Sequence, residues 1–275
     1  MNFFDKIVYG LDAQMQRPGM YGWFHLIFLA VTIIATVLLC VFCKNCSRKS
    51  FKWIMFSAWL AMLIFEIFKQ LTTSFEYNPS TQKVVWDYEW ESFPFQLCST
   101  PLYILPFIAF CKEGKFRDSL IAFLSTFALF GGLATMLLPA TVFVETVVIN
   151  IQTMVHHGLQ IVVGIFALVH ERKKLNLKYF LRSLIVFGVV LVIALVSNLI
   201  MKEILTEKFN MFYISPYYPC VLPLLEIIYV KVPYVVFLLI YIIGFILAAF
   251  AIYMIQYGFI KLGMRKRKKE SRQNE

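Results

Sequence analysis

The chain has 275 residues, of which 60% are hydrophobic and 15% are charged, and its mean hydropathy is +0.73. A soluble domain of this length does not need so much apolar surface, so the composition excludes a soluble globular protein and predicts a polytopic membrane protein. The formal net charge is +10. Because the basic residues fall between apolar runs and at the C-terminal end, they are typical of membrane topology signals and not of a nucleic-acid surface.

Seven apolar stretches predict an all-α bundle of seven transmembrane helices in a single membrane domain, residues 1–275. A helix of about 20 apolar residues is long enough to cross the hydrocarbon core of a bilayer. In chain order the expected spans are 21–42, 53–71, 91–111, 119–138, 150–169, 179–201 and 233–257. Residues 1–20 are expected to be a surface segment without a cleaved signal peptide. An apolar part of the sixth loop, 218–229, is expected to return to the membrane surface.

The charges between the spans predict the orientation of the chain. Basic clusters follow the first, fifth and seventh spans, at 44–52, 172–178 and 261–272, whereas the acidic loop 72–91 follows the second span. Since basic loops stay on the cytoplasmic side, we expect the N-terminus outside and the C-terminus inside. Residues 261–275 then form a basic cytoplasmic tail of a multi-pass protein of the cell membrane.

The segment 93–101 (FPFQLCSTP) carries polar groups into the third expected span. Pro101 leaves the carbonyl of Leu97 without its helical donor and disfavours a helical conformation at Thr100. Irregular backbone at membrane depth is tolerated where protein or a cavity covers it. The pattern therefore predicts a loosened backbone and a candidate site at Cys98; the alternative is a small buried thiol beside a packing kink.

Polar residues gather in the outer third of five expected spans, while the inner halves of these spans are almost wholly apolar. At a rise of about 1.5 Å per residue, Cys98, His156 and His157 lie about 10 Å below the outer surface, Glu66 about 8 Å and His25 about 6 Å. Asn198 lies near the outer end of the sixth span. Interfacial snorkelling accounts for Lys69 but not for a thiol or a mid-helix glutamate. This distribution predicts a site in the outer part of the bundle.

The fifth expected span has a polar stripe at helical spacing, made of Thr153, His157, Gln160 and Gly164. His156 points about 100° away from this stripe. Periodicity does not decide which of the two histidines faces the interior, so both are candidates.

A cysteine in apolar surroundings is inert unless a base generates the thiolate. A histidine within hydrogen-bond reach supplies this base, and a carboxylate orients the histidine. Cys98, His157 or His156, and Glu66 are therefore the expected catalytic set. Residues expected to contact the substrate, some of them as donors to an oxyanion, are His25, Gln96, Thr100, Gln160, Asn198 and Asn210.

A C-x-x-C-x-x-C run at Cys40, Cys43 and Cys46 lacks a nearby histidine or further cysteine to complete a zinc site. These thiols are expected to fill apolar space. The sequence also contains no recognisable ATP- or CoA-binding motif, so neither a metal nor an organic cofactor is expected.

Several short motifs resemble, in order and spacing, those of the bacterial YwaF-type integral membrane proteins. They are His25 in FHL, Glu66, FPFQLC at 93–98, His157, FNMFY at 209–213 and VPY at 232–234. These proteins look like prokaryotic relatives of the transmembrane protein 164 acyltransferases, which remodel phospholipids. The resemblance covers nearly the whole chain. The family pattern usually has leucine and histidine where this chain has Phe93 or Phe95 and Gln96, which removes one proton carrier.

The resemblance implies a cysteine–histidine acyl-transfer site with Cys98 as nucleophile and His157 as base, acting on membrane phospholipids and lysophospholipids at the outer-leaflet side. A more distant likeness to the androgen-induced membrane hydrolases makes Thr100 the second candidate nucleophile and ester hydrolysis the alternative reaction. The same polar cluster is also compatible with a small-ligand binder or transporter, or with a scaffold that has no chemistry.

Overall fold

The computed structural model describes residues 2–273, with side chains described through residue 263. Within this part of the chain, six helical segments are long and apolar enough to cross a membrane. They are α2 (Trp23–Phe42), α3 (Arg48–Ser74), the continuous segment Lys115–Leu137, α7 (Val147–His170), α8 (Leu177–Ile204) and α10 (Tyr234–Gln273). The prediction of a helical, multi-pass membrane protein is confirmed, and six of the seven expected spans correspond to these helices.

The expected third span, 91–111, is not one helix. The chain forms the 3-10 turns η1 (Trp90–Ser92) and η2 (Leu97–Ser99), and the helix α4 (Pro101–Phe110) begins only at the proline. Proline at the first helical position loses no hydrogen bond, so Pro101 starts a helix where the sequence was expected to interrupt one. At about 1.5 Å per residue, α4 is about 15 Å long, which is half the thickness of the hydrocarbon core.

A second proline lies inside α4, where the structure compensates for it. Pro106 has no N–H to donate to the carbonyl of Leu102, four residues earlier. The indole Nε1 of Trp59, on α3, donates to this carbonyl at 2.9 Å. The short helix is therefore fixed against α3 by the hydrogen bond that its own backbone lacks.

The segment Lys115–Leu137 contains a π-helical turn. It consists of α5 (Lys115–Phe123), η3 (Leu124–Ala128) and α6 (Leu129–Leu137). The carbonyls of this turn accept side-chain donors from other helices: Ser125 O from Gln256 Nε2 of α10 at 2.9 Å, and Ala128 O from Gln160 Nε2 of α7 at 2.5 Å. π turns occur often at functional positions.

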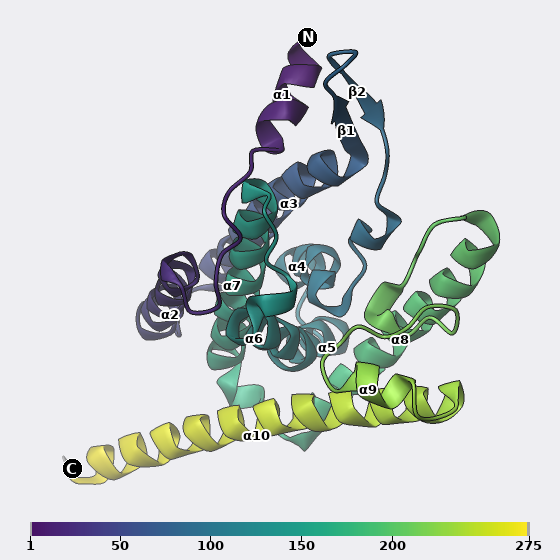
Figure 1. Ribbon diagram of the computed structural model, residues 1–275. Helices are drawn as coiled ribbons and strands as arrows, with labels where there is room; N and C mark the ends of the chain where they lie inside the picture. The colour runs from purple at the N-terminus through teal and green to yellow at the C-terminus, as the bar shows by residue number, and fades with distance from the viewer. Residues whose placement is uncertain (1, 274–275) are drawn as a thin grey trace.

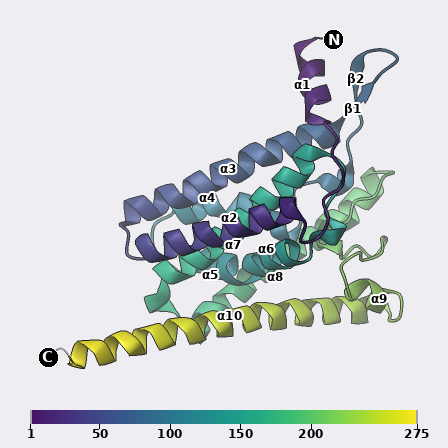
Figure 2. The same ribbon diagram turned by 60° about the vertical axis from the view of Figure 1, so that its left-hand side comes forward.

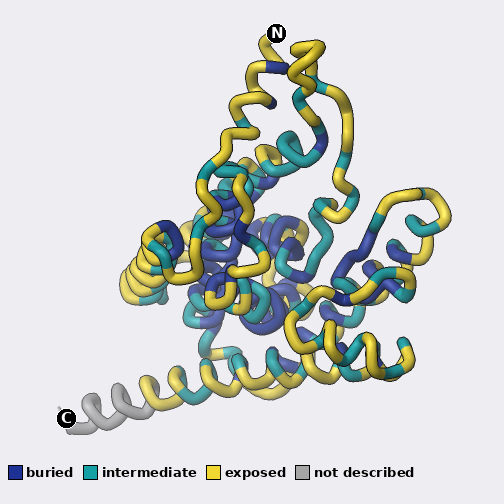
Figure 3. Tube along the Cα trace, viewed as in Figure 1, coloured by how far each residue is buried: buried dark blue, intermediate teal, exposed yellow. Residues whose placement is uncertain are grey.

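The helix α7 is the centre of the bundle. Most of its membrane-spanning window is buried (78%), compared with 11% for α2, and it packs against α2, α3 and α6. Figure 3 shows the buried residues gathered around α7, α5 and α6, while α2 and α10 are largely exposed. In Figures 1 and 2, α10 runs along one side of the bundle, and it contacts the bundle mainly through η3 and the short helix α9 (Leu225–Tyr229).

A small extramembrane unit projects beyond one end of α3 (Figure 1). It contains α1 (Phe3–Leu11) and the antiparallel hairpin of β1 (Phe75–Asn78) and β2 (Lys83–Trp86). Asn2 begins α1 because its side chain and that of Asp5 form a reciprocal capping box. Asp5 also accepts a hydrogen bond from the backbone of Val84. The segment 1–20 and the loop after α3 thus have regular structure that the sequence did not indicate.

The opposite end of the bundle is held by ion pairs, and we call this end the basic end. Arg117 is fully buried; its guanidinium donates to Glu171 at 3.1 Å and to the carbonyl of Ile108 at 3.0 Å. Lys174, in η5 (Arg172–Lys174), bridges Glu171 and Asp118. The basic tail predicted at 261–275 continues α10 as helix to Gln273, and its side chains from 264 onward lie outside the described residues.

Candidate functional site

Cys98 lies in η2, between α6 and α7. The turn is closed by Thr100, whose hydroxyl donates to the carbonyl of Leu97 at 2.6 Å. On one side, a Cβ placed on Gly131 of α6 would lie 3.6 Å from the Cβ of Cys98. On the other side, Nε2 of His156 contacts the carbonyl of Cys98 at 2.9 Å. The predicted loosening of the backbone is therefore real, and α6 and α7 cover it.

The hydrogen bonds of the two histidines define their tautomers. A carbonyl oxygen can only accept, so the ring nitrogen that faces it carries the proton in a neutral imidazole. His156 donates from Nε2 to Cys98, and His157 donates from Nδ1 to the carbonyl of Thr153 at 2.7 Å. The other nitrogens, Nδ1 of His156 and Nε2 of His157, are buried and have no hydrogen-bond partner in the described structure. Each ring thus presents a free lone pair.

Gln160 lies one turn below these histidines on α7. Its amide donates to Ala128, while its Oε1 is buried and unpartnered among the residues described. The same stretch of α7 therefore holds three buried acceptor atoms without donors. Unsatisfied buried polar atoms are costly and uncommon, and they are expected where a ligand, a water or a reacting group completes the site.

His156 contacts the backbone carbonyl of Cys98, and this hydrogen bond does not involve the sulfur. The expected contact between sulfur and an imidazole nitrogen is not among the hydrogen bonds of the described residues. The two imidazole rings lie edge to face, with centroids 5.4 Å apart. Of the two histidines, His156 makes the contact with η2, whereas the hydrogen bond of His157 stays within its own helix.

Glu66 faces the bundle, as predicted, and is 5% exposed. Its Oε1 accepts from Lys69 at 2.9 Å and from Gln70 at 2.7 Å, and its Oε2 accepts from Gln152 at 2.9 Å. Gln152 is one turn away from His156 on α7. The carboxylate therefore ties α3 to α7 beside the histidines, and these hydrogen bonds come from amides and an ammonium group.

Both ring nitrogens of His25 bond to the backbone of other residues and not to the cysteine. Its Nδ1 accepts from the backbone of Tyr21 at 2.9 Å, and its Nε2 donates to the carbonyl of Met136 at 2.8 Å. These bonds support Tyr21, whose φ of 60° is unusual for a bulky residue. Both nitrogens are used, so His25 joins the start of α2 to the end of α6.

Gln96, Asn198 and Asn210 build a buried loop that covers η2. Gln96 donates to the carbonyl of Asn210 at 3.0 Å and accepts from the backbone of Phe212 at 2.7 Å. Asn198 makes the equivalent pair of bonds with the backbone of Met211. They hold η6 (Met211–Tyr213), in which Phe212 and its neighbour both have positive φ. Strained backbone of this kind persists only where its surroundings fix it.

The sequence did not lead us to Gly131, which lies against Cys98 and forms one wall of the candidate site. Gly131 leaves space beside Cys98, and a Cβ on the adjacent Gly132 would lie 3.2 Å from the carbonyl of His157. The Gly-Gly pair in the fourth expected span was the available signal, because paired small residues allow close helix packing in membranes.

These features define a polytopic helical membrane protein with a half-buried cysteine and two buried histidines between its helices. The pattern of the TMEM164 family matches residues 20–257, and the chain belongs to this family. The resemblance seen in the sequence is thereby confirmed at the level of the family. No curated protein and no solved structure matches the chain.

Proposed function

We propose that the protein is a membrane-embedded acyltransferase that moves an acyl chain from a phospholipid to a lysophospholipid through an acyl-thioester on Cys98. The observation that carries the proposal is the position of Cys98 beside an imidazole whose free nitrogen has no partner. The family resemblance supports the same chemistry, since it implies a cysteine–histidine acyl-transfer site.

The geometry favours His156 over His157 as the base. The ring of His156 contacts Cys98 directly, and its unprotonated Nδ1 has no partner in the described structure, so His156 is the first candidate to take the thiol proton. His157 lies next to it and is the second candidate. Glu66 acts through Gln152 and α7 as a positioning residue, because its own bonds do not reach an imidazole.

The proposed reaction has two halves that use the same histidine. The histidine takes the Cys98 proton, the thiolate attacks the ester carbonyl of the donor, and the lysophospholipid alkoxide leaves with the proton from the imidazolium. The acceptor hydroxyl then gives its proton to the imidazole and attacks the thioester, which expels the Cys98 thiolate, and the imidazolium returns its proton to the sulfur. Atoms and protons balance without a metal or an organic cofactor.

We also propose that the N-terminus and the extramembrane unit lie outside the cell membrane and that the basic end lies inside. Arg48, Arg117 and Lys174 gather at one end of the bundle, as the positive-inside rule expects for the cytoplasmic side. The cysteine and histidines then belong to the outer half of the membrane, where donor and acceptor are phospholipids of the outer leaflet.

A direct test uses purified protein in nanodiscs with a phospholipid donor that carries an isotope-labelled acyl chain and an unlabelled lysophospholipid acceptor. Lipid mass spectrometry should find the label on the acceptor, and peptide mapping should find a hydroxylamine-sensitive acyl group on Cys98. Cys98→Ser should lose most of the transfer, because the hydroxyl is a poorer nucleophile without a base tuned for it. Cys111→Ser, at another half-buried cysteine, is the matched control.

Each outcome has a definite reading. Label in free fatty acid instead of the acceptor identifies a hydrolase that uses the same site. Label in neither product, together with an unmodified Cys98, contradicts the proposed chemistry and favours the binder or transporter.

A further inference from the structure

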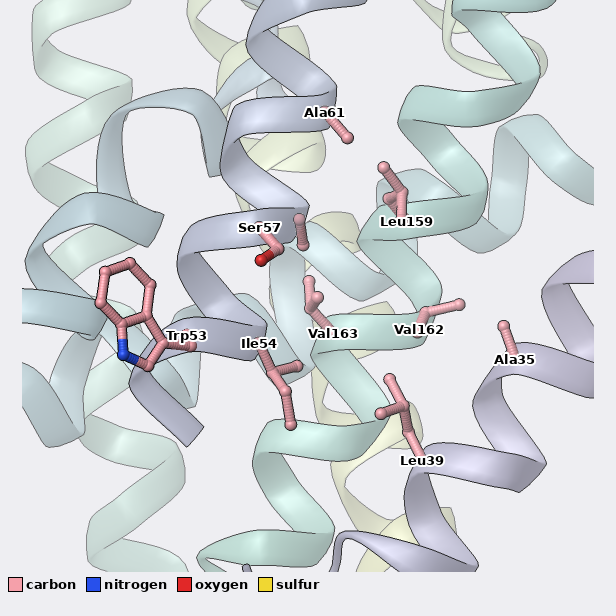
Figure 4. Close-up of a pocket in the computed structure, with 10 residues that line it drawn as sticks. Ala35, Leu39, Trp53, Ile54, Ser57, Ala61, Leu159, Val162 and Val163 are labelled. Atoms are coloured by element: carbon pink, nitrogen blue, oxygen red, sulfur yellow. The ribbon is translucent and has the colours of Figure 1, made fainter. Parts of the chain in front are cut away.

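An apolar groove lies on the membrane-facing side of the bundle, between α2 and α3, with α7 as its floor (Figure 4). Its volume is about 450 Å³. We call it the α2–α3 groove; its lining residues are Ala35, Leu39, Trp53, Ile54, Ser57, Ala58, Ala61, Leu159, Val162 and Val163. Ser57 is the one lining residue with a polar side chain besides the indole of Trp53.

The groove exists because two helices pack on a third without packing on each other. Both α2 and α3 contact α7 extensively, whereas α2 and α3 hardly meet within the described structure. At one end, α2 approaches α7 so closely that a Cβ on Gly158 would lie 2.6 Å from Oγ1 of Thr32. Beyond this contact, the small side chains of Ala35 and Ala61 leave space between the helices.

One end of the groove adjoins the candidate site. Leu159 lies one turn of α7 from His156, and Ala61 lies five residues before Glu66, or about 8 Å along α3. The groove continues from Ala61 to Trp53, eight residues or about 12 Å along α3. The polar cluster therefore lies at one end of an apolar track that leads deeper into the membrane.

The chemistry of the lining restricts the occupant. The volume is within the range of about 300–1,000 Å³ that is usual for ligand sites. Water and headgroups are disfavoured, because the lining offers almost no hydrogen-bonding partners. A flexible hydrocarbon chain that enters from the bilayer satisfies both restrictions.

We propose that the α2–α3 groove binds the acyl chain of a phospholipid, with its carbonyl end toward Ala61 and His156 and its methyl end toward Trp53. This proposal rests on the proposed function, since it makes the bound chain the one that reacts at Cys98. It assigns the selection of acyl chains to small residues of α2 and α3, which lie outside the candidate catalytic set.

The test is photo-crosslinking in nanodiscs with two phospholipid probes, one with a diazirine near the carbonyl of its sn-2 chain and one with a diazirine near the methyl end. The first probe should label peptides that contain Ala61 or Leu159, and the second should label peptides that contain Trp53 or Leu39. The experiment is run on Cys98→Ser as well as on the unchanged protein, so that labelling does not depend on turnover.

Two alanines of α2 provide a matched pair of variants. Ala35 lines the groove, whereas Ala30 is exposed and lies about 140° away around the same helix. Ala35→Leu should reduce labelling of the groove about tenfold, a ratio that corresponds to about 1.4 kcal/mol. Ala30→Leu should leave it unchanged. Ser57→Leu, on α3, is a second filling variant, and thermal unfolding in detergent verifies that each variant is folded.

The outcomes separate this proposal from the proposed function. Ordered labelling without acyl transfer supports the lipid site and contradicts the chemistry. Acyl transfer with label spread evenly over the lipid-facing helices, or with no effect of Ala35→Leu, overturns the acyl-chain site. The reverse order of labelling identifies a lipid that enters from the Trp53 end and also overturns it.

Discussion

His156 donates a 2.9 Å hydrogen bond from Nε2 to the backbone carbonyl of Cys98. The histidine thus fixes the peptide of the cysteine and leaves its own Nδ1 unprotonated and without a partner in the described structure. One contact sets both the position of the 3-10 turn and the tautomer of the imidazole that we propose as the base. This is the kind of second hydrogen bond that orients a catalytic imidazole.

The first prediction separates the two histidines. His156→Ala should lower single-turnover acylation by about 10²–10⁴-fold, the usual contribution of a general base. His156→Gln keeps an N–H that can reach the Cys98 carbonyl and should restore stability but not rate. His157→Ala serves as the comparison and should have a smaller effect on acylation. If the His157 variant instead loses most of the rate, the base is His157, as the family resemblance implies.

The second prediction concerns the loop that covers the site. Gln96→Ala removes the hydrogen bonds that this side chain makes with the carbonyl of Asn210 and the amide of Phe212, and should cost about 1–3 kcal/mol, because a buried donor and acceptor lose their bonds. Hydrogen exchange should rise at the amide of Phe212 while the amides of α7 stay protected. Gln14→Ala, at an exposed glutamine, provides the control. Unchanged exchange at Phe212 would show that the loop is held by other contacts.

A third prediction addresses the crossing of α2 and α7. Gly158→Ala places a methyl group 2.6 Å from Thr32 Oγ1, and this overlap should cost about 1–3 kcal/mol relative to Gly188→Ala, where nothing lies within 4 Å. Both substitutions gain the same helix propensity, so their difference isolates the clash. Thermal unfolding in detergent measures this difference in stability between the two variants. Adding Thr32→Ala to Gly158→Ala should recover most of the loss; failure to do so would mean that the helices are not pressed together there.

The fourth prediction is the acid response of the basic end. Burial raises the pKa of Glu171, but the adjacent His170 ring, the hydrogen bond from Lys174 and the charges of Lys174 and Arg117 outweigh it and lower the pKa to about 2. Because the folded pKa lies below the usual 4.5, the stabilisation is complete above about pH 4.5 and is lost as the pH falls toward 2.

The unfolding temperature of the unchanged protein should therefore drop more steeply over this interval than that of Glu171→Gln. At neutral pH this variant should already be less stable by about 3–5 kcal/mol, because Arg117 is left buried without its partner. Glu113→Gln removes an exposed carboxylate of the same region and is the control. Parallel acid profiles for the unchanged protein and Glu171→Gln would assign the acid sensitivity to other carboxylates.

The fifth prediction is the orientation. An epitope inserted after Ser80, in the exposed turn of the hairpin, should bind antibody on intact cells, and a green fluorescent protein fused to the C-terminus should fluoresce. The two readouts lie on opposite sides in this arrangement. An epitope that is reached only after permeabilisation would reverse the orientation and place Cys98 on the inner side.

The sequence predicted the long spans well, since 20 or more apolar residues leave few alternatives to a membrane helix. It was less informative at 91–111, because hydropathy does not distinguish a spanning helix from an apolar turn followed by a short helix. The decisive factor there is Pro101, which can interrupt a helix or begin one, and tertiary contacts such as Trp59 with Leu102 decide between these outcomes.

The candidate site was predicted in outline but not in its contacts. Helical periodicity placed His156 and His157 near the level of Cys98, yet it could not indicate which ring would contact η2. Gln96, Asn198 and Asn210 were expected to face a substrate because they are polar residues in an apolar chain. The structure uses them to bind the backbone of an irregular buried loop, and the sequence gives no signal for the path of that loop.

The π turn at Leu124–Ala128 has a consequence for insertions and deletions. A π turn holds one more residue than the α-helical turn it replaces, so it offsets all that follows by about 100°. Deleting a single residue there would restore regular hydrogen bonding in the helix. It would also turn Gly131 away from Cys98 and remove the Ala128 carbonyl from Gln160. The gain in local regularity would thus remove Gly131 and the Ala128 carbonyl from the candidate site. The proposed chemistry therefore depends on the register of this helix more than on its composition.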